Sequence, residues 1–244
     1  MFQSDVAYDR FMGRFSRGLA PLFANFAGIE AGQRVLDVGA GTGALTAELL
    51  ARSAEVAAAE PSAPFVDALR ERYPGVDARV AAAEQLPWPD ESFDAALAQL
   101  VVAFMSDHHA GAHEMRRVVR EGGTVAMCTW DRQGMEMLAA VDRTRTALGD
   151  EAEGASAYRN REDVESLLGP GAEAELLEVE GTYSGFEDFW EALLGGAGPA
   201  GAWATSLDDE RRVVARAELY RQLGEPDGPF AMTGRAWAIR VTRA

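Results

Sequence analysis

The sequence predicts an α/β fold in which helices cover both faces of a mostly parallel sheet. Two observations lead to this prediction. Short apolar runs alternate with helix-forming stretches along residues 35–130, and the first apolar run ends in glycines that open a helix. The length agrees, because 244 residues suit one enlarged α/β domain better than two full domains. We therefore expect a single doubly wound domain over residues 1–244.

The predicted sheet begins in the first half of the chain. Residues 35–38 are a short apolar run ending in glycines, which indicates a strand followed by a tight turn. Pro64 stands at the start of a predicted helix, where its missing N–H costs nothing. Residues 86–91 contain two prolines and predict a loop. The expected strands are 35–38, 55–59, 77–81, 93–99 and 124–129, and the expected helices are 42–52, 64–73 and 109–119.

Beyond Trp130 the alternation is less regular. Apolar Trp237, Ile239 and Val241 occupy every second position, which predicts a half-buried last strand at 237–241. Residues 195–201 are rich in glycine and predict a break. The other expected elements are a strand at 174–180, helices at 135–148, 161–168, 186–194 and 207–223, and one or two N-terminal helices carrying Phe11, Phe15, Leu22 and Phe26.

The charge of the chain bears on its partners. The formal net charge is −16, and such an acidic surface repels nucleic-acid backbones and anionic membranes. Arg116, Arg117 and Arg120 lie close together, but acidic neighbours flank them, so we interpret them as a solvated helix face. We expect no nucleic-acid partner and no membrane partner. A small neutral or cationic molecule is the partner that the charge favours.

Other features suggest a cytoplasmic protein. No apolar run reaches the roughly 18 residues of a membrane-spanning helix, and the N-terminus lacks an export pattern. The single cysteine, Cys128, excludes an internal disulfide framework and a cysteine-only metal cluster. The three histidines lack matching carboxylates, so no metal site is expected. The sequence does not specify an oligomeric state.

The strongest chemical signal is the glycine loop that follows the first strand. Gly39, Gly41 and Gly43 let the backbone approach a ligand closely, and the free N–H groups of the next helix suit an anionic group. This signal is weak by itself, because Gly39, Gly41 and Ala44 also fit the dinucleotide-binding pattern.

Three acidic positions bear on the class of cofactor, and two of them, Asp37 and Glu84, argue against a nicotinamide cofactor. Asp37 lies two residues before the first glycine, where a dehydrogenase strand is usually apolar, and it either accepts from a ligand amino group or caps nearby loop amides. Glu60 ends the second strand, where a carboxylate can hold both ribose hydroxyls in either class of cofactor. Glu84 begins a Glu-Gln-Leu-Pro stretch that leads into the fourth strand, and this stretch decides between the classes.

These motifs together resemble the class I S-adenosylmethionine-dependent methyltransferases, in particular the small-molecule branch called methyltransferase type 11. The match covers residues 8–131 in the family's order. Its motifs are Asp37-x-Gly39-x-Gly41-x-Gly43, Glu60-Pro61-Ser62, Glu84-x-Leu86-Pro87, Phe93-Asp94-Ala95 and Glu114-Met115-Arg116-Arg117-Val118 with Gly122-Gly123.

The resemblance implies a Rossmann-like sheet of seven strands with the last one antiparallel, N-terminal helices and a helical insert after strand five. It divides the chain into a helical cover (1–30), a cofactor-binding core (31–131) and a substrate side (132–244). It also implies S-adenosyl-L-methionine as cofactor, S-adenosyl-L-homocysteine as product and transfer of a methyl group to a small molecule. The implied cofactor-binding residues are Tyr8, Arg14, Asp37, Gly39, Ala40, Gly41, Glu60, Pro61, Ala83, Glu84, Gln99 and Leu100.

Each implied residue has an expected partner on the cofactor. The glycine loop lies against the methionine part with Asp37 near its amino group, and Glu60 holds the ribose hydroxyls with Pro61 beside the sugar. The backbone N–H of Ala83 and the side chain of Glu84 face the adenine ring. The family often has Asp where this chain has Glu84. Gln99 and Leu100 flank the sulfonium, and Tyr8 and Arg14 are candidates for the methionine carboxylate.

No catalytic residue is assigned from the sequence. Many family members carry histidines directly after the fourth strand, whereas this chain has Val102-Ala103-Phe104 there. His108 and His109 come slightly later, after Ser106-Asp107. They form either part of a base or the first turn of a helix that Ser106 or Asp107 caps.

The acceptor and the methylated atom are not identified by the sequence. Residues with apolar or aromatic side chains after the fifth strand are expected to contact the acceptor: Trp130, Met135, Met137, Leu138, Tyr158, Phe186, Phe189, Trp190 and Trp203. The helical spacing of Phe186, Phe189 and Trp190 equally fits core packing. Two other functions stay open at this point, a non-catalytic nucleoside-binding protein that acts through a partner and a nicotinamide-dependent oxidoreductase.

Overall fold

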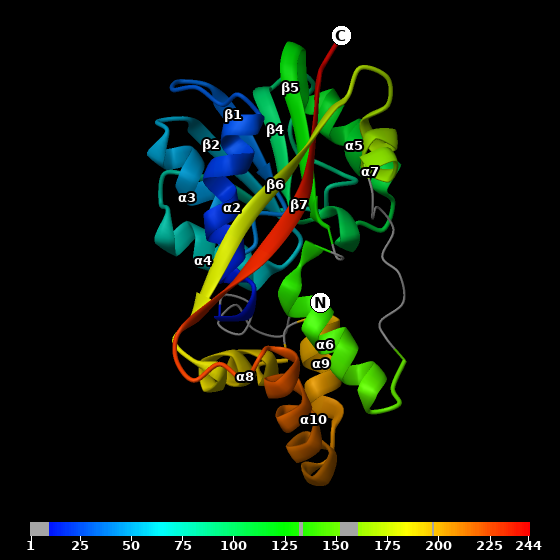
Figure 1. Ribbon diagram of the computed structural model, residues 1–244. Helices are drawn as coiled ribbons and strands as arrows, with labels where there is room; N and C mark the ends of the chain where they lie inside the picture. Colours follow the sequence, from blue (N-terminus) through cyan, green and yellow to red (C-terminus); the bar gives the residue numbers. More distant parts are fainter. Residues whose placement is uncertain (1–9, 132–133, 152–160, 197) are drawn as a thin grey trace. The chain divides into compact units, whose positions relative to one another are not determined.

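A seven-stranded sheet organises the fold, with strands in the order β3-β2-β1-β4-β5-β7-β6 (Figure 1). The computed structural model describes residues 10–131, 134–151, 161–196 and 198–244. The strands are β1 (Arg34–Val38), β2 (Glu55–Glu60), β3 (Asp77–Val80), β4 (Phe93–Gln99), β5 (Val119–Trp130), β6 (Glu173–Tyr183) and β7 (Phe230–Thr242). The helices are α2 (Gly13–Phe26), α3 (Ala44–Ala51), α4 (Ala63–Arg72), η1 (Val102–Phe104), α5 (His108–Val118), α6 (Glu136–Ala147), α7 (Arg161–Leu168), α8 (Phe186–Leu194), α9 (Gly198–Ser206) and α10 (Asp209–Gln222).

Strand directions confirm the predicted fold class. β1 pairs in parallel with β2 and β4, and the parallel pairing continues to β3 on one side and to β5 on the other. The last strand, β7, runs antiparallel to β5, with Trp130 opposite Ala236 and Thr124 opposite Thr242. The protein therefore has the doubly wound, seven-stranded α/β sheet with an antiparallel last strand.

The chain divides into two compact units. The sheet unit comprises Leu19–Trp130, Ala157–Leu177 and Ala236–Ala244, as far as these ranges are described. The helical unit comprises the described residues within Met1–Gly18, Asp131–Ser156 and Glu178–Arg235. Helix α2 and the long strands β6 and β7 contribute residues to both units. The predicted division into 1–30, 31–131 and 132–244 stays a prediction.

The sheet unit has helices on both faces of its strands. Figure 1 shows α3 and α4 on one face and α5 and α7 on the other. The end of α2 lies beside α3, because Arg52 donates to Pro21 O and Asn25 Oδ1. The central strands are apolar on both faces, as strands covered twice must be. Their fully buried side chains include Leu36, Leu97 and Phe93. Leu36 and Phe93 belong to one buried hydrophobic cluster with Met115 of α5.

The helical unit has an aromatic core of its own. The ring of Tyr183, at the end of β6, is buried and stacks on Phe230 at a centroid distance of 5.4 Å. Phe189 of α8 meets the same tyrosine edge-on at 5.2 Å. Phe186 packs edge-on against Tyr220 of α10 at 5.0 Å. Core packing therefore explains the helical spacing of the α8 aromatics.

Three element predictions differ from the structure. The predicted glycine break at 195–201 is wrong over its second half, because α9 begins at Gly198. The positive φ angles, which interrupt helical backbone, occur at Gly196 and at Gly198, the first residue of α9. β5 begins at Val119 rather than 124. Val119 already pairs with β4, and the irregular stretch around Gly122, which has a positive φ, is a register shift within the strand and not a loop before it. β7 spans Phe230–Thr242, far longer than the predicted 237–241. None of the described helices has the length and apolar character needed to cross a membrane.

Candidate functional site

The order of the strands changes direction at β1. The chain moves from β1 to β2 and β3 on one side, and to β4 and β5 on the other. Such a switch point leaves a crevice at the carboxyl ends of the two central strands, where ligands bind in open α/β sheets. Asp37 is the register partner of Ala58 on β2 and of Leu97 on β4. The residues that follow β1, β2 and β4 are therefore the ones to inspect.

Three glycines after β1 have different roles. All three have a positive φ, which L side chains rarely adopt. A Cβ on Gly39 would lie 2.4 Å from Val101 Cγ2, and one on Gly43 would lie 2.8 Å from Leu69 Cδ2, so both are required by packing. A Cβ on Gly41 would meet nothing nearer than Gly39 O at 4.0 Å. Gly41 therefore leaves space that a ligand can occupy.

Asp37 is a buried acid near the end of β1. Its residue is 1% exposed, and the Thr46 hydroxyl of α3 donates to Oδ2 over 2.6 Å. Burial raises the pKa of Asp37 to about 7, the Thr46 hydrogen bond opposes that shift, and the nearby Glu60 adds to it. Sequence reasoning missed Thr46, although a hydroxyl among the apolar residues of the following helix was a usable signal.

Glu60 is a second, nearly buried acid at the end of β2, 7% exposed. Its Oε2 accepts from the N–H of Gly41 over 3.0 Å, and its Oε1 accepts from the N–H of Ser62 over 2.9 Å. Burial raises the pKa of Glu60 and these two hydrogen bonds oppose the shift. Among the described residues no basic side chain contributes to the pKa shift of Asp37 or Glu60, so a ligand group that is cationic or donates hydrogen bonds would stabilise both carboxylates. Pro61 follows at the exposed edge.

The loop after β3 provides a backbone donor and a third carboxylate. Ala83 is buried, and within the described part of the chain its N–H has no acceptor. A buried N–H without an acceptor favours a ligand that supplies one. Glu84 Oε1 accepts from the N–H groups of Ser106 at 2.5 Å and Asp107 at 3.1 Å.

The end of β4 carries backbone strain. Leu100 has a φ of 63° and its N–H donates to Cys128 O over 3.0 Å. A left-handed leucine persists only where its surroundings hold it, and such residues cluster at functional sites. Gln99 precedes it as the last residue of β4 and is in register with Cys128 of β5. The structure thus brings Asp37, Gly39, Ala40, Gly41, Glu60, Pro61, Ala83, Glu84, Gln99 and Leu100 into the sheet unit, at or after the ends of neighbouring strands.

The comparisons with known proteins agree with this geometry. The profile described as methyltransferase domain matches residues 36–127. An uncharacterized protein of Mycobacterium bovis is 30% identical over 229 residues, covering 88% of this chain and 82% of the relative. The chain belongs to the class I S-adenosylmethionine-dependent methyltransferases. Its cofactor is S-adenosyl-L-methionine.

Two further similarities accompany this membership. A demethylmenaquinone methyltransferase of Mycobacterium sp. (strain KMS) is 43% identical over 101 residues, which cover 41% of this methyltransferase and 43% of the relative. A solved structure of a putative type II methyltransferase from Anaeromyxobacter dehalogenans has a TM-score of 0.69 at 24% identity, covering 94% of this chain and 97% of that one. That second likeness concerns the fold.

Two predicted residues of the methyltransferase do not lie in the sheet unit as described. Tyr8 lies outside the described residues. Arg14 belongs to the helical unit, where it donates to both carboxylate oxygens of Asp188 at 2.9 and 2.5 Å and to Thr182 O at 2.6 Å. Its guanidinium also stands 4.4 Å from the centroid of the Tyr183 ring. Contact of either residue with the methionine carboxylate stays a prediction.

The acidic residue before the histidines is a helix cap. Asp107 Oδ1 accepts from the N–H groups of His109 and Ala110, both at 3.0 Å, and His108 is the first residue of α5. One of the two sequence interpretations is thereby confirmed, with the histidines in the first helical turn. These contacts lower the pKa of Asp107. Among the described residues there is no group of His, Cys, Asp and Glu that would hold a metal ion.

Arg117 holds several loop residues by hydrogen bonds, whereas the sequence interpretation made it part of a solvated helix face. Its guanidinium donates to both oxygens of Glu114 at 2.7 and 2.8 Å, to Asp90 at 2.8 Å, and to the carbonyls of Leu86 and Trp88 at 2.9 and 2.8 Å. Glu114 in turn accepts from the N–H of Leu86 over 3.0 Å. The pair therefore fixes the proline-containing loop that follows Glu84, a role that only the folded chain reveals.

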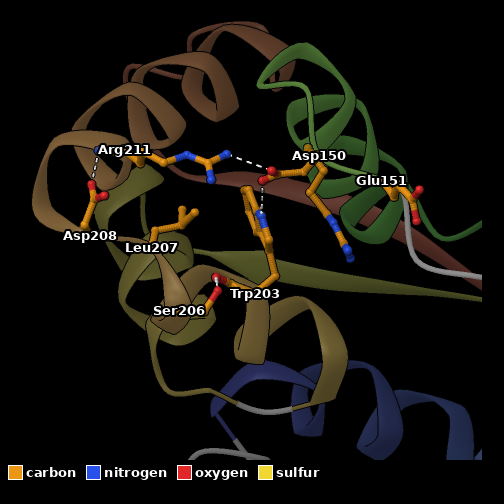
Figure 2. Close-up of a pocket in the computed structure, with 8 residues that line it drawn as sticks. Asp150, Glu151, Trp203, Ser206, Leu207, Asp208 and Arg211 are labelled. Atoms are coloured by element: carbon orange, nitrogen blue, oxygen red, sulfur yellow. Dashed lines mark hydrogen bonds and ion pairs between the residues drawn. The ribbon is translucent and has the colours of Figure 1, made fainter.

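The helical unit contains a polar cavity of about 380 Å³ (Figure 2). It is lined by Arg145, Asp150, Glu151, Trp203, Ser206, Leu207, Asp208 and Arg211. Asp150 accepts from Trp203 Nε1 at 2.8 Å and from Arg211 at 2.7 Å, so these groups satisfy one another. Trp203, one of the residues expected to contact the acceptor, lines this cavity, and acceptor contact stays a prediction. Met135, Met137, Phe189 and Trp190 are instead buried, and Tyr158 lies outside the described residues.

Proposed function

We propose that this methyltransferase transfers the methyl group of S-adenosyl-L-methionine to a small, neutral or cationic molecule. The observation that supports the site of transfer is the pair of nearly buried carboxylates, Asp37 and Glu60, at the ends of adjacent strands. The open space at Gly41 lies between them in the chain, and Gly41 N–H donates to Glu60. Two buried acids that no described basic side chain neutralises suit a ligand with an amino group and hydroxyl donors.

Each acid has its own part in the proposal. Asp37, held by Thr46, accepts from the ammonium group of the cofactor's methionine portion, while the backbone at Gly39, Ala40 and Gly41 lies against that portion. Glu60 accepts from the ribose hydroxyls, and its bonds to Gly41 and Ser62 orient it for that purpose. When bound, the cofactor supplies an electrophilic methyl group on a sulfonium.

The adenine part is assigned to the loop after β3. Ala83 donates its unpaired N–H to a ring nitrogen, and Glu84 accepts from the exocyclic amino group with the carboxylate oxygen that is not bound to Ser106 and Asp107. Pro61 packs beside the sugar. Gln99 and Leu100, at the end of β4, flank the reacting sulfur.

A small acceptor is favoured by two considerations. The net charge of −16 repels nucleic acids, and one relative is named for a small acceptor, demethylmenaquinone. Methyl transfer is an in-line displacement, so holding the acceptor opposite the sulfonium supplies much of the rate enhancement. A general base is needed only for an acceptor that loses a proton. The assignment of residues 132–244 to the acceptor side stays a prediction.

The test combines binding with transfer of a labelled methyl group. Wild-type protein is titrated calorimetrically with S-adenosylhomocysteine, then incubated with methyl-labelled S-adenosylmethionine and a cell extract separated by molecular size. We expect label in the small-molecule fraction. Glu60→Ala should lose at least about tenfold in affinity, because a carboxylate that accepts two ribose hydroxyl bonds is removed.

Glu55→Ala is the matched control, because Glu55 lies on the same strand at its opposite, exposed end. It should bind and transfer like wild type. Label found only in protein or nucleic acid would contradict the proposed acceptor. Equal affinities of the Glu60 and Glu55 variants would contradict the proposed site.

A further inference from the structure

The segment after β4, residues 100–107, touches both predicted cofactor loops. Val101 fills the space over Gly39, where a Cβ would lie 2.4 Å from its Cγ2. At the other end, Met105 occupies the space beside Gly111 of α5, since a Cβ there would lie 2.8 Å from Met105 Sδ and 3.5 Å from Ala83 Cβ. The segment therefore spans from the glycine loop to the adenine loop.

Glu84 ties this segment to the adenine loop with hydrogen bonds. Its Oε1 accepts from two consecutive backbone N–H groups, those of Ser106 and Asp107. Among the described residues its Oε2 accepts no hydrogen bond. Bonds from N–H groups to an ionised carboxylate are stronger than neutral ones. One carboxylate thus holds the segment with one oxygen and offers the other to a ligand.

We propose that Glu84 is a positioning residue that couples occupation of the adenine subsite to the order of residues 100–107. The inference rests on the proposed function, because it takes Oε2 as the acceptor for the adenine amino group. That amino group restricts the carboxylate, and the restricted carboxylate holds Ser106 and Asp107 more firmly. The segment begins at the strained Leu100, next to the sulfonium in the proposal, so the coupling brings order to the place where the acceptor reacts.

The length of the side chain makes this possible. Glu84 reaches the Ser106 and Asp107 amides with the full length of its side chain, and on the proposal an aspartate, one methylene shorter, would keep the ligand contact and lose the two amides. The same loop is held from its far side by Glu114 and Arg117, which bind residues 86–90. The backbone that carries Glu84 is therefore fixed, and the freedom left to Glu84 lies in its side chain. The two oxygens of the Glu84 carboxylate thus connect the adenine subsite to residues 106 and 107.

The test measures hydrogen exchange of the Ser106 and Asp107 amides in the full chain, with and without ligand. S-adenosylhomocysteine should slow both amides about tenfold or more in wild type, since their hydrogen bonds to the carboxylate are charge-assisted. S-inosylhomocysteine, which carries a carbonyl oxygen in place of the adenine amino group, should bind more weakly and give no slowing. Equal slowing by both ligands would overturn the inference.

Two variants separate the contact of Glu84 with the ligand from its contact with the Ser106 and Asp107 amides. Glu84→Asp should bind S-adenosylhomocysteine within a few-fold of wild type yet exchange both amides about tenfold faster, with or without ligand. Glu84→Gln keeps one side-chain oxygen that accepts from the Ser106 and Asp107 amides, but it presents an NH₂ group to the adenine amino group. Both amides should therefore stay protected and no longer respond to ligand. Glu71→Asp, at an exposed position on α4, is the control and should match wild type.

The outcomes distinguish the two proposals. Failure of wild type to bind S-adenosylhomocysteine would overturn the proposed function and this inference together. Tight binding with unchanged exchange at Ser106 and Asp107 would overturn the coupling alone. Wild-type exchange in Glu84→Asp would do the same.

Discussion

At the scale of single residues, Asp37 shows a conflict between folding and binding. Its carboxylate is buried, and no cation in the described part of the chain compensates it, so the charged form is penalised. The folded pKa of about 7 lies above the ordinary value of 3.8. The folded state therefore keeps this proton up to a higher pH than the unfolded chain does. Stability from this group is present in full below pH 3.8 and is lost as the pH rises from there to about 7.

Cofactor affinity should consequently depend on pH. The ammonium group stabilises ionised Asp37, so binding below pH 7 releases a proton. Affinity for S-adenosylhomocysteine should rise as the pH increases from 6 to 7, by at most about tenfold per unit, and then level off. Calorimetry in buffers of different ionisation enthalpy measures the released proton. A flat affinity profile with no proton release would contradict the role of Asp37.

Asp37→Asn provides the control for that measurement. The variant should bind weakly at every pH and release no proton from this position. Without ligand it should unfold at a higher temperature than wild type at pH 8, because the buried charge is gone. Its advantage should disappear near pH 4, where both side chains are neutral in the folded state.

At the scale of elements, the glycine loop separates packing from ligand access. Gly39→Ala places a Cβ against Val101 and should cost about 3 kcal/mol or more of unfolding free energy. Gly41→Ala should cost only about 1 kcal/mol, because its Cβ meets open space. That variant should nevertheless lose at least about tenfold in cofactor affinity, since the Cβ stands where the ligand approaches.

Chemical denaturation and calorimetry on the two variants check this separation. Gly75→Ala serves as the control, because Gly75 has no close neighbour and no positive φ. Unimpaired cofactor binding by a folded Gly41→Ala variant would contradict the proposed position of the methionine portion.

Most elements could be predicted because local patterns determine them. The β1 run, the proline at the start of α4 and the acids ending β1 and β2 are all readable within a few residues. Arg117 could not be judged correctly, because its partners Leu86, Trp88 and Asp90 lie about thirty residues away in sequence. The length of β7 also depends on pairing with distant β5. The predicted glycine break at 195–201 is wrong for a different reason: Gly201 lies inside α9 because it must pack closely against Gly196, so its glycine serves packing rather than a break.

At the scale of the whole molecule, the net charge of −16 should attract the cofactor more strongly than its product. S-adenosylmethionine carries a sulfonium and is a net cation, whereas S-adenosylhomocysteine is a neutral zwitterion. An acidic protein attracts the cation over several ångströms, and salt screens that attraction. The surface therefore favours loading of the methyl donor over rebinding of the product.

The ionic-strength dependence of binding should reveal this preference. Between about 20 mM and about 500 mM salt, the affinity for S-adenosylmethionine should fall about two- to threefold more than the affinity for S-adenosylhomocysteine. Parallel titrations of the two ligands at each salt concentration make the measurement. Identical salt responses would mean that the surface charge has no part in cofactor selection.

The pairing of Trp130 with Ala236 has an evolutionary consequence. These register partners on β5 and β7 are also the residues at which the chain leaves the sheet unit and finally returns to it. A sequence stretch whose ends meet can be lengthened or replaced without disturbing the host domain. Apart from residues 157–177, the intervening stretch can therefore vary between relatives while β1, β2 and β4 and the loops that follow them keep their places in the sheet unit. On the predicted assignment of residues 132–244 to the acceptor side, such an exchange would change what is methylated and leave the donor site as it is.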